Sequence, residues 1–303
     1  MVEQTMFFAG NPISRFSNER RDVEWVQNAL EAEDSCFLPV CKFEFPATDG
    51  EQSSLLWGDR SWLEVAKGPA EPIFLGRFKE HAHFAFDVGD VASPLDAFGL
   101  SGVGTFFGLR KLASLLSPEE AAIAAQARSV LEWHSRHPFC PGCGKRSVNR
   151  NGGTSRHCPQ CQTDHFPRVD PVAIVLVTHG ERCLLGRSGK YESTLYSALA
   201  GFVEHGESIE EAARREIKEE SGIEVGEVTY VASQPWPFPY SLMIGCYGEA
   251  LTETIVLDED ELVDARWFTK DHLRTALAGT ADDLTVPGRL AIARYLIEKW
   301  VAQ

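Results

Sequence analysis

Residues 201–223 read GFVEHGESIEEAARREIKEESGI, and this stretch decides most of the fold. Ser208 and Glu211 form the S-x-x-E pattern of a helix capping box. Gly222 supplies a residue of the kind that ends helices in the left-handed conformation. The pattern therefore predicts a helix over residues 209–221.

Three glutamates of this predicted helix share a face with its apolar residues. At about 100° per residue, Glu216, Glu219 and Glu220 fall within the arc that holds the apolar side chains. Carboxylates on an inward face are costly unless a positive group meets them, and a divalent cation such as Mg²⁺ or Mn²⁺ meets that need. Arg215, one turn before Glu219, can orient its carboxylate. The helix therefore predicts a metal site, whereas its other glutamates are expected on a solvated face.

The spacing within this stretch matches a named pattern. The sequence resembles the Nudix box, G-x5-E-x7-R-E-U-x-E-E-x-G-U with U apolar, at Gly201, Glu207, Arg215, Glu216, Ile217, Glu219, Glu220, Gly222 and Ile223. The resemblance implies a Nudix hydrolase, an α/β/α sandwich that uses divalent metal ions. Enzymes of this kind cleave nucleoside diphosphates linked to another group.

A four-cysteine module precedes the box. Two C-x2-C pairs, separated by fourteen residues, comprise Cys140, Cys143, Cys158 and Cys161. Four thiolates suit one tetrahedral Zn²⁺ and leave no open position, so we predict a structural zinc ribbon with a hairpin at residues 151–153. Contact of the ribbon with nucleic acid is the alternative function.

The rest of the chain divides around these motifs into an α/β (α+β) protein. We predict an N-terminal α+β domain over 1–130, a helix end and zinc ribbon over 131–167, and a Nudix domain over 168–303. A capping pattern at Ser117–Glu120 predicts a helix to about residue 136, and a last helix is expected at about 288–301. No internal repeat is visible in the sequence. Strands are predicted at 36–45, 61–65, 72–75, 83–88, 172–177, 183–185, 228–232, 242–250 and 265–268.

A proline-rich loop narrows the family. Residues 233–241 read SQPWPFPYS, a stiff segment whose aromatic rings can contact a base or ribose, or can pack on one another. This segment resembles the signature of the NADH pyrophosphatase (NudC-type) branch, which also carries a zinc ribbon. The resemblance implies cleavage of NAD(H) to AMP and nicotinamide mononucleotide, removal of NAD caps from RNA, and a homodimer.

The resemblance also implies the site residues. Two or three Mg²⁺ or Mn²⁺ ions would be held by the carbonyl of Ala200 and by Glu216, Glu219, Glu220 and Glu261, with Glu219 or Glu220 as the general base. Phe202 would stack on nicotinamide, Phe166 would stack from the partner subunit, and Arg110 would reach a phosphate or ribose. The remaining substrate contacts would be Gln234, Pro235, Trp236, Pro237, Phe238, Pro239, Tyr240, Ser241 and Ala293.

Composition limits the alternatives. A net charge of −15 disfavours nucleic-acid binding as the sole function. One basic island, residues 134–170, carries six Lys/Arg against two acids and is a candidate RNA contact. No apolar run approaches the roughly 20 residues of a membrane span, and no secretory signal is visible, so we expect a cytoplasmic protein. The alternatives are hydrolysis of another nucleotide such as ADP-ribose, and an inactive nucleotide-sensing regulator.

Overall fold

The computed structural model describes residues 6–66, 71–189 and 194–303. The chain divides into two compact units. The first comprises Met1–Val169 with Trp236–Tyr240, and the second comprises Asp170–Pro235 with Ser241–Gln303. None of the helices in the described ranges has the length and apolarity that a membrane crossing requires.

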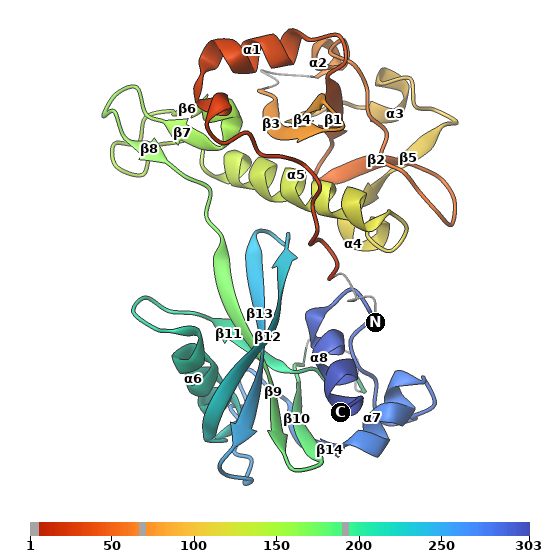
Figure 1. Ribbon diagram of the computed structural model, residues 1–303, viewed down its shortest axis with the longest axis vertical. Coiled ribbons are helices and arrows are strands. Elements are labelled where there is room, and N and C mark those ends of the chain that lie inside the picture. Colours follow the sequence, from red (N-terminus) through yellow and green to blue (C-terminus); the bar gives the residue numbers. More distant parts are fainter. Residues whose placement is uncertain (1–5, 67–70, 190–193) are drawn as a thin grey trace. The chain divides into compact units, whose positions relative to one another are not determined.

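The second unit is built around one mixed sheet (Figure 1). Its central strand β9 (Asp170–His179) pairs parallel to β13 and antiparallel to β10 and β11. Residues 172–177 are all buried, as expected for a strand covered on both faces. The path order is β12-β13-β9-β10-β14, from β10 (Arg182–Arg187), β11 (Leu199–Phe202), β12 (Val225–Trp236), β13 (Ser241–Ala250) and β14 (Asp264–Thr269).

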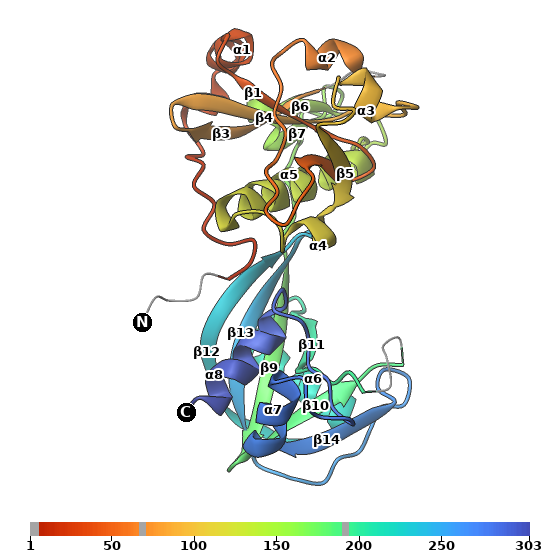
Figure 2. The same ribbon diagram turned by 90° about the vertical axis from the view of Figure 1, so that its right-hand side faces the viewer.

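Helices cover both faces of this sheet, which confirms the α/β/α sandwich. On one face, Ala173, Val175 and Val177 of β9 pack in one core with Ala212 and Ile217 of α6 (Ile209–Ser221). On the other face, α7 (Lys270–Leu277) and α8 (Ile292–Val301) lie against β14 and β13 (Figure 2). The helix α6, which carries the Nudix-box glutamates, therefore lies on the opposite face of the sheet from α7 and α8.

The first unit repeats the strand arrangement of the second. In both, a hairpin (β3–β4, β12–β13) has its second strand parallel to the first strand of the unit (β1, β9). In both, the next strand pairs antiparallel with the last one (β2–β5, β10–β14). The strands are β1 (Cys36–Val40), β2 (Glu44–Thr48), β3 (Ile73–Phe78), β4 (His81–Asp87) and β5 (Gly104–Gly108). The structure therefore shows a partial repeat of strand pairing, although no internal repeat is visible in the sequence.

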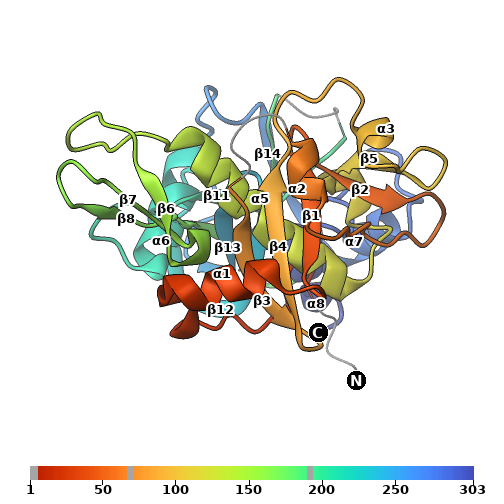
Figure 3. The ribbon, with the colours of Figure 1, turned by 90° about the horizontal axis from the view of Figure 1, so that it is seen from above.

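Unlike the strands of the second unit, these five strands form two separate sheets, β1-β4-β3 and β2-β5. The helices α1 and α5 lie on opposite sides of the three-stranded sheet (Figures 1 and 3). The segment 61–65, predicted as a strand, contains a four-residue helix, because Trp62 packs over Gly58 and joins the aromatic core. This helix takes the place in chain order that α6 has in the second unit. The helical elements are η1 (Glu19–Arg21), α1 (Val23–Glu31), α2 (Trp62–Val65), α3 (Pro94–Ala97), α4 (Leu109–Leu112) and α5 (Pro118–Arg136).

The helix ends test the capping predictions. Both halves of the Ser208–Glu211 box form, and Gly222 has φ +71°, so α6 has the predicted bounds. At α5 only half a box forms: Ser117 accepts from the Glu120 amide, whereas the Glu120 carboxylate accepts from Leu55 N. The last helix begins at Ile292 and not at 288, because residues 288–291 form a turn.

The zinc ribbon forms the predicted hairpin and belongs to the first unit. Its elements are β6 (Val148–Arg150), η2 (Asn151–Gly153), β7 (Ser155–His157) and β8 (Asp164–His165). Arg156 is buried and donates to Ser147 Oγ and O, Asn149 Oδ1 and His134 Nδ1, at 2.6–2.8 Å. His134 Nε2 lies 2.7 Å from the Gly153 carbonyl oxygen. Arg156 and His134 therefore join the ribbon to the end of α5.

These contacts remove Arg156 from the basic residues of the island that could face RNA. Arg156 is 4% exposed, so it cannot offer its charge to a polyanion. Arg150 pairs with Asp164 at 3.2 Å, and Arg136 pairs with Glu132. Arg168 lies 5.8 Å from the centroid of the Tyr240 ring, so at least four of the island's six basic residues have partners inside the protein.

We predict that Arg156→Met destabilises the protein by about 2–4 kcal/mol, because it leaves buried polar groups without a donor. The matched change Arg150→Met removes a half-exposed surface pair and should cost under about 1 kcal/mol. Denaturant unfolding of the two variants makes the comparison. Equal losses would show that the Arg156 network does not stabilise the ribbon.

A second prediction concerns acid stability. Burial is the main cause that lowers the pKa of His134 to about 4. The unfolded chain, with an ordinary histidine pKa of about 6.5, therefore binds this proton more tightly than the native protein. The unfolding free energy should be insensitive to this group above about pH 6.5 and fall by up to about 3 kcal/mol towards pH 4.

Unfolding curves across that range test the pH dependence. His134→Gln should remove this part of the slope, whereas His81→Gln, which changes an exposed histidine, should retain it. A slope that survives in His134→Gln would assign the effect to other groups.

Candidate active site

The box glycine makes room for a carboxylate. Gly201 lies in β11, paired with Ala173 of β9, and α6 packs against β11. A Cβ atom on Gly201 would lie 1.8 Å from the Glu216 carboxyl carbon. Only glycine therefore allows the strand to approach the helix with Glu216 between them.

Arg215 organises the acidic face. Its guanidinium donates to both oxygens of Glu207, at 2.6 and 2.9 Å. The same group donates to Glu216 Oε1 at 2.9 Å, to Glu219 Oε2 at 3.0 Å and to the Phe202 carbonyl at 2.9 Å. Orientation of Glu219 by Arg215 is thus confirmed. The role of Glu207 was not predicted, and its position in the box was its only signal.

Pairing with Arg215 and burial shift the pKa values of these carboxylates in opposite directions. The hydrogen bonds from Arg215 lower the pKa of Glu207 to about 2. Burial raises the pKa of Glu216 despite Arg215. Glu220 is 7% exposed, and burial, followed by repulsion from Glu261 and Glu216, raises its pKa to about 8.

Glu220 is a carboxylate in need of a positive charge. Within the described ranges, no side chain forms a hydrogen bond or ion pair with its oxygens, since Arg215 reaches only its neighbours. Burying a carboxylate beside other carboxylates is unfavourable unless a cation compensates. Hard oxygen ligands of this kind fit a divalent ion such as Mg²⁺.

A turn brings a further acid to the helix. Val256 N donates to Ser221 O and Asp258 N to Glu220 O, so the chain after β13 is tied to the end of α6. Through this turn the charges of Glu261 and Asp258 act on Glu220. The carboxylates are gathered less tightly than the cysteines, which are the one described group of three or more candidate ligands with all ligand atoms within 4.8 Å.

The cysteine cluster fits one zinc ion. The Sγ atoms of Cys140 and Cys161 lie 3.5 Å apart, and those of Cys143 and Cys158 lie 3.4 Å apart. His165 Nε2 lies 3.2 Å from Cys140 Sγ. The donor set is that of a closed structural site.

The predicted substrate residues fall into both units. Trp236–Tyr240, which we call the aromatic tip, belongs to the first unit together with Arg110 and Phe166. Ala200, Phe202, Gln234, Pro235, Ser241, Ala293 and the glutamates belong to the second unit. Phe166 and Phe202 are 67% and 58% exposed, so both rings are available to stack.

Two predicted contacts are buried. Gln234 is fully buried, and its side chain donates to Leu290 O and accepts from Ile292 N, at 2.8 and 2.9 Å. It therefore holds the start of α8. Ala293, in the first turn of α8, is 3% exposed.

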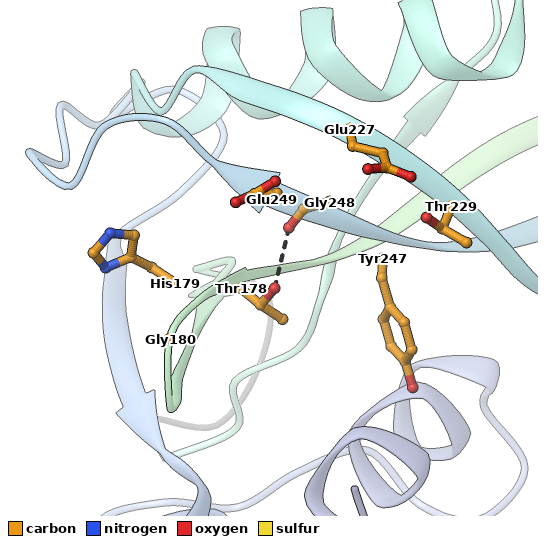
Figure 4. Close-up of a pocket in the computed structure, with 8 residues that line it drawn as sticks. All are labelled: Thr178, His179, Gly180, Glu227, Thr229, Tyr247, Gly248 and Glu249. Atoms are coloured by element: carbon orange, nitrogen blue, oxygen red, sulfur yellow. Dashed lines mark hydrogen bonds between the residues drawn. The ribbon is translucent and has the colours of Figure 1, made fainter.

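A pocket of roughly 350 Å³ lies elsewhere in the second unit, at the carboxyl ends of β9 and β13 (Figure 4). Figure 4 shows the Tyr247 side chain pointing towards a helix, and its hydroxyl donates to Leu296 O of α8. The pocket contains none of the predicted site residues. Its lining is Thr178, His179, Gly180, Glu227, Thr229, Tyr247, Gly248 and Glu249.

Comparison with known families agrees with this geometry. Residues 167–286 match the family model described as "NUDIX domain", and residues 135–166 match the model described as "NADH pyrophosphatase zinc ribbon domain". Residues 34–133 match "NADH pyrophosphatase-like rudimentary NUDIX domain", in line with the repeated strand order. The protein is a Nudix hydrolase. More narrowly, the chain belongs to the NADH pyrophosphatase (NudC-type) family.

Relatives support this assignment. The NAD-capped RNA hydrolase NudC of Stutzerimonas stutzeri is 38% identical over 264 residues, which cover 87% of this chain and 88% of the relative. Human NAD-capped RNA hydrolase NUDT12 is 48% identical over 197 residues, covering 61% of this chain and 43% of the relative. Mouse mitochondrial NAD(P)H pyrophosphatase NUDT13 is 38% identical over 243 residues, covering 74% and 69%. The match thus spans less than half the length of NUDT12.

The environment of Glu220 yields a prediction on catalysis. Glu220→Gln keeps the side chain's shape and removes its charge, and should lower kcat for pyrophosphate hydrolysis by at least about 10²-fold. Glu224→Gln, just after α6, changes an exposed glutamate that pairs with Lys218, and should leave kcat within about twofold. Steady-state kinetics of the two folded variants and the wild-type protein make this comparison of kcat. Retained activity in Glu220→Gln would exclude this cluster as the metal site.

Proposed function

We propose that the protein hydrolyses the pyrophosphate bond of NAD(H) to AMP and nicotinamide mononucleotide, and that it removes NAD caps from RNA 5′ ends. The observation that carries the proposal is the buried, unpaired Glu220 within the carboxylate set of an intact Nudix box. The aromatic tip and the four-cysteine ribbon support the NAD-directed branch. The relatives named above support both activities.

The residues present suit two or three Mg²⁺ or Mn²⁺ ions. We infer that Glu216, Glu219, Glu220, Glu261 and the Ala200 carbonyl hold them. Such ions, when bound, neutralise a pyrophosphate and lower the pKa of a coordinated water. Zinc on the four cysteines would be structural.

The protein's own side chains orient the metal ligands, accept a proton and bind the substrate. Arg215 holds Glu216 and Glu219 in fixed orientations. Glu219 or Glu220 accepts the proton of the attacking water. The Phe202 ring stacks on the nicotinamide, the aromatic tip contacts the nucleotide, and Arg110 pairs with a phosphate or contacts a ribose. Phe166 stacks from the partner subunit of a homodimer.

We also propose the division into 1–130, 131–167 and 168–303 for the N-terminal domain, the ribbon segment and the Nudix domain. Matches to family descriptions with similar bounds support it. A cytoplasmic location is the remaining proposal and rests on the sequence alone, since one relative, mouse NUDT13, is named as mitochondrial.

Product analysis tests the activity. With Mg²⁺ or Mn²⁺ we expect AMP and reduced nicotinamide mononucleotide from NADH, and 5′-monophosphate RNA from NAD-capped RNA. NAD⁺ and ADP-ribose are offered in parallel, and the Glu220→Gln protein, purified in the same way, controls for contaminating hydrolases. Faster turnover of ADP-ribose than of every NAD substrate would instead assign the protein as an ADP-ribose hydrolase. No cleavage of any of them would indicate a nucleotide-sensing protein.

A further inference from the structure

The aromatic tip is held by side chains of the first unit. Its backbone offers little anchorage, because two of its five residues are prolines without an N–H, and Phe238 N donates to Trp236 O within the tip. Phe8, which is buried, forms a T-shaped pair with the Phe238 ring, with centroids 5.9 Å apart. Ser129 Oγ of α5 donates to the Pro239 carbonyl at 3.0 Å. The orientation of the tip therefore depends on contacts outside its own hairpin.

Two guanidinium groups meet the Phe238 ring. Arg110 lies 4.0 Å and Arg128 5.1 Å from the ring centroid. Arg110 is exposed, and within the described ranges it has no carboxylate in ion-pair range, so its charge is left for an anionic ligand. Arg128 is different, since its side chain is only 15% exposed and pairs with the buried Glu132.

Burial makes the positive charge of Arg128 unfavourable relative to an exposed arginine. Burial lowers its pKa, the paired Glu132 carboxylate opposes this shift, and the nearby Arg110 adds to it. Besides Phe238, its guanidinium lies 5.1 Å from the ring centroid of Phe43. A cation that contacts two rings and is fixed by a buried carboxylate restrains those rings, because cation–π attraction strengthens when water is excluded.

We propose that Arg128, with Ser129, is a positioning residue that fixes the aromatic tip for substrate, while Arg110 on the same ring stays free to meet the substrate's phosphate. The inference rests on the proposed function, since contact of the tip with substrate is part of it. It gives α5 of the first unit a part in substrate binding.

The chain supplies a matched control. Arg128 and Arg136 each pair with the Glu132 carboxylate from one helical turn away, yet within the described contacts only Arg128 meets Phe238. Arg128→Gln should raise KM for NADH about 10-fold with kcat within about twofold. Arg136→Gln should leave both constants within about twofold. Arg128→Lys, which keeps the charge, should fall between wild type and Arg128→Gln.

A readout without substrate separates positioning from general stability. Hydrogen exchange followed by mass spectrometry reports the three amides of the tip. Arg128→Gln and Ser129→Ala should speed their exchange while other peptides of the first unit are unchanged. Ser135→Ala, which removes a hydroxyl that donates to Glu132 O on the same helix, should not.

The outcomes are distinguishable. Equal effects of Arg128→Gln and Arg136→Gln on KM, or unchanged exchange of the tip in Arg128→Gln, would overturn the positioning role. If wild-type protein cleaves no NAD substrate while the tip responds as expected, the proposed function fails and the positioning role stands. If Arg128→Gln does not fold, Arg128→Lys and Ser129→Ala decide between the same outcomes.

Discussion

One guanidinium group holds the acidic face of α6 in order. Arg215 donates five hydrogen bonds, to three glutamates and one backbone carbonyl, at 2.6–3.0 Å. It thereby fixes where two predicted metal ligands point. Glu220, beyond its reach and buried, is the carboxylate that still requires a cation. Among the predicted metal ligands of α6, Glu216 and Glu219 pair with Arg215, whereas Glu220 does not.

The sequence predicted those parts of the structure whose signals are local. A capping box and Gly222 determine both ends of α6, and the C-x2-C spacing brings four sulfurs together. Failures occurred where tertiary contacts decide. Residues 61–65 form a helix because Trp62 packs over Gly58. The strand β11 was missed because its four residues are too few to show a pattern, and only pairing with β9 defines it.

The same distinction applies to single residues. The charge of Arg156 indicated solvent, yet its partners lie across a hairpin and on α5, and no sequence spacing reveals them. Gln234 was predicted from family resemblance as a substrate contact, whereas its hydrogen bonds reach residues more than fifty positions later. For polar residues whose partners are distant in sequence, local patterns do not indicate whether the side chain is buried or exposed.

The repeated strand order separates what folding requires from what chemistry requires. Both units keep the parallel pair and the hairpin, but one retains a thirteen-residue helix at the position where the other has four residues. The match of residues 34–133 to a rudimentary NUDIX domain agrees with this comparison. The paired strands of the first unit bury an aromatic core without the acidic helix. The folding of such strands therefore does not depend on the carboxylates that we expect to bind metal ions.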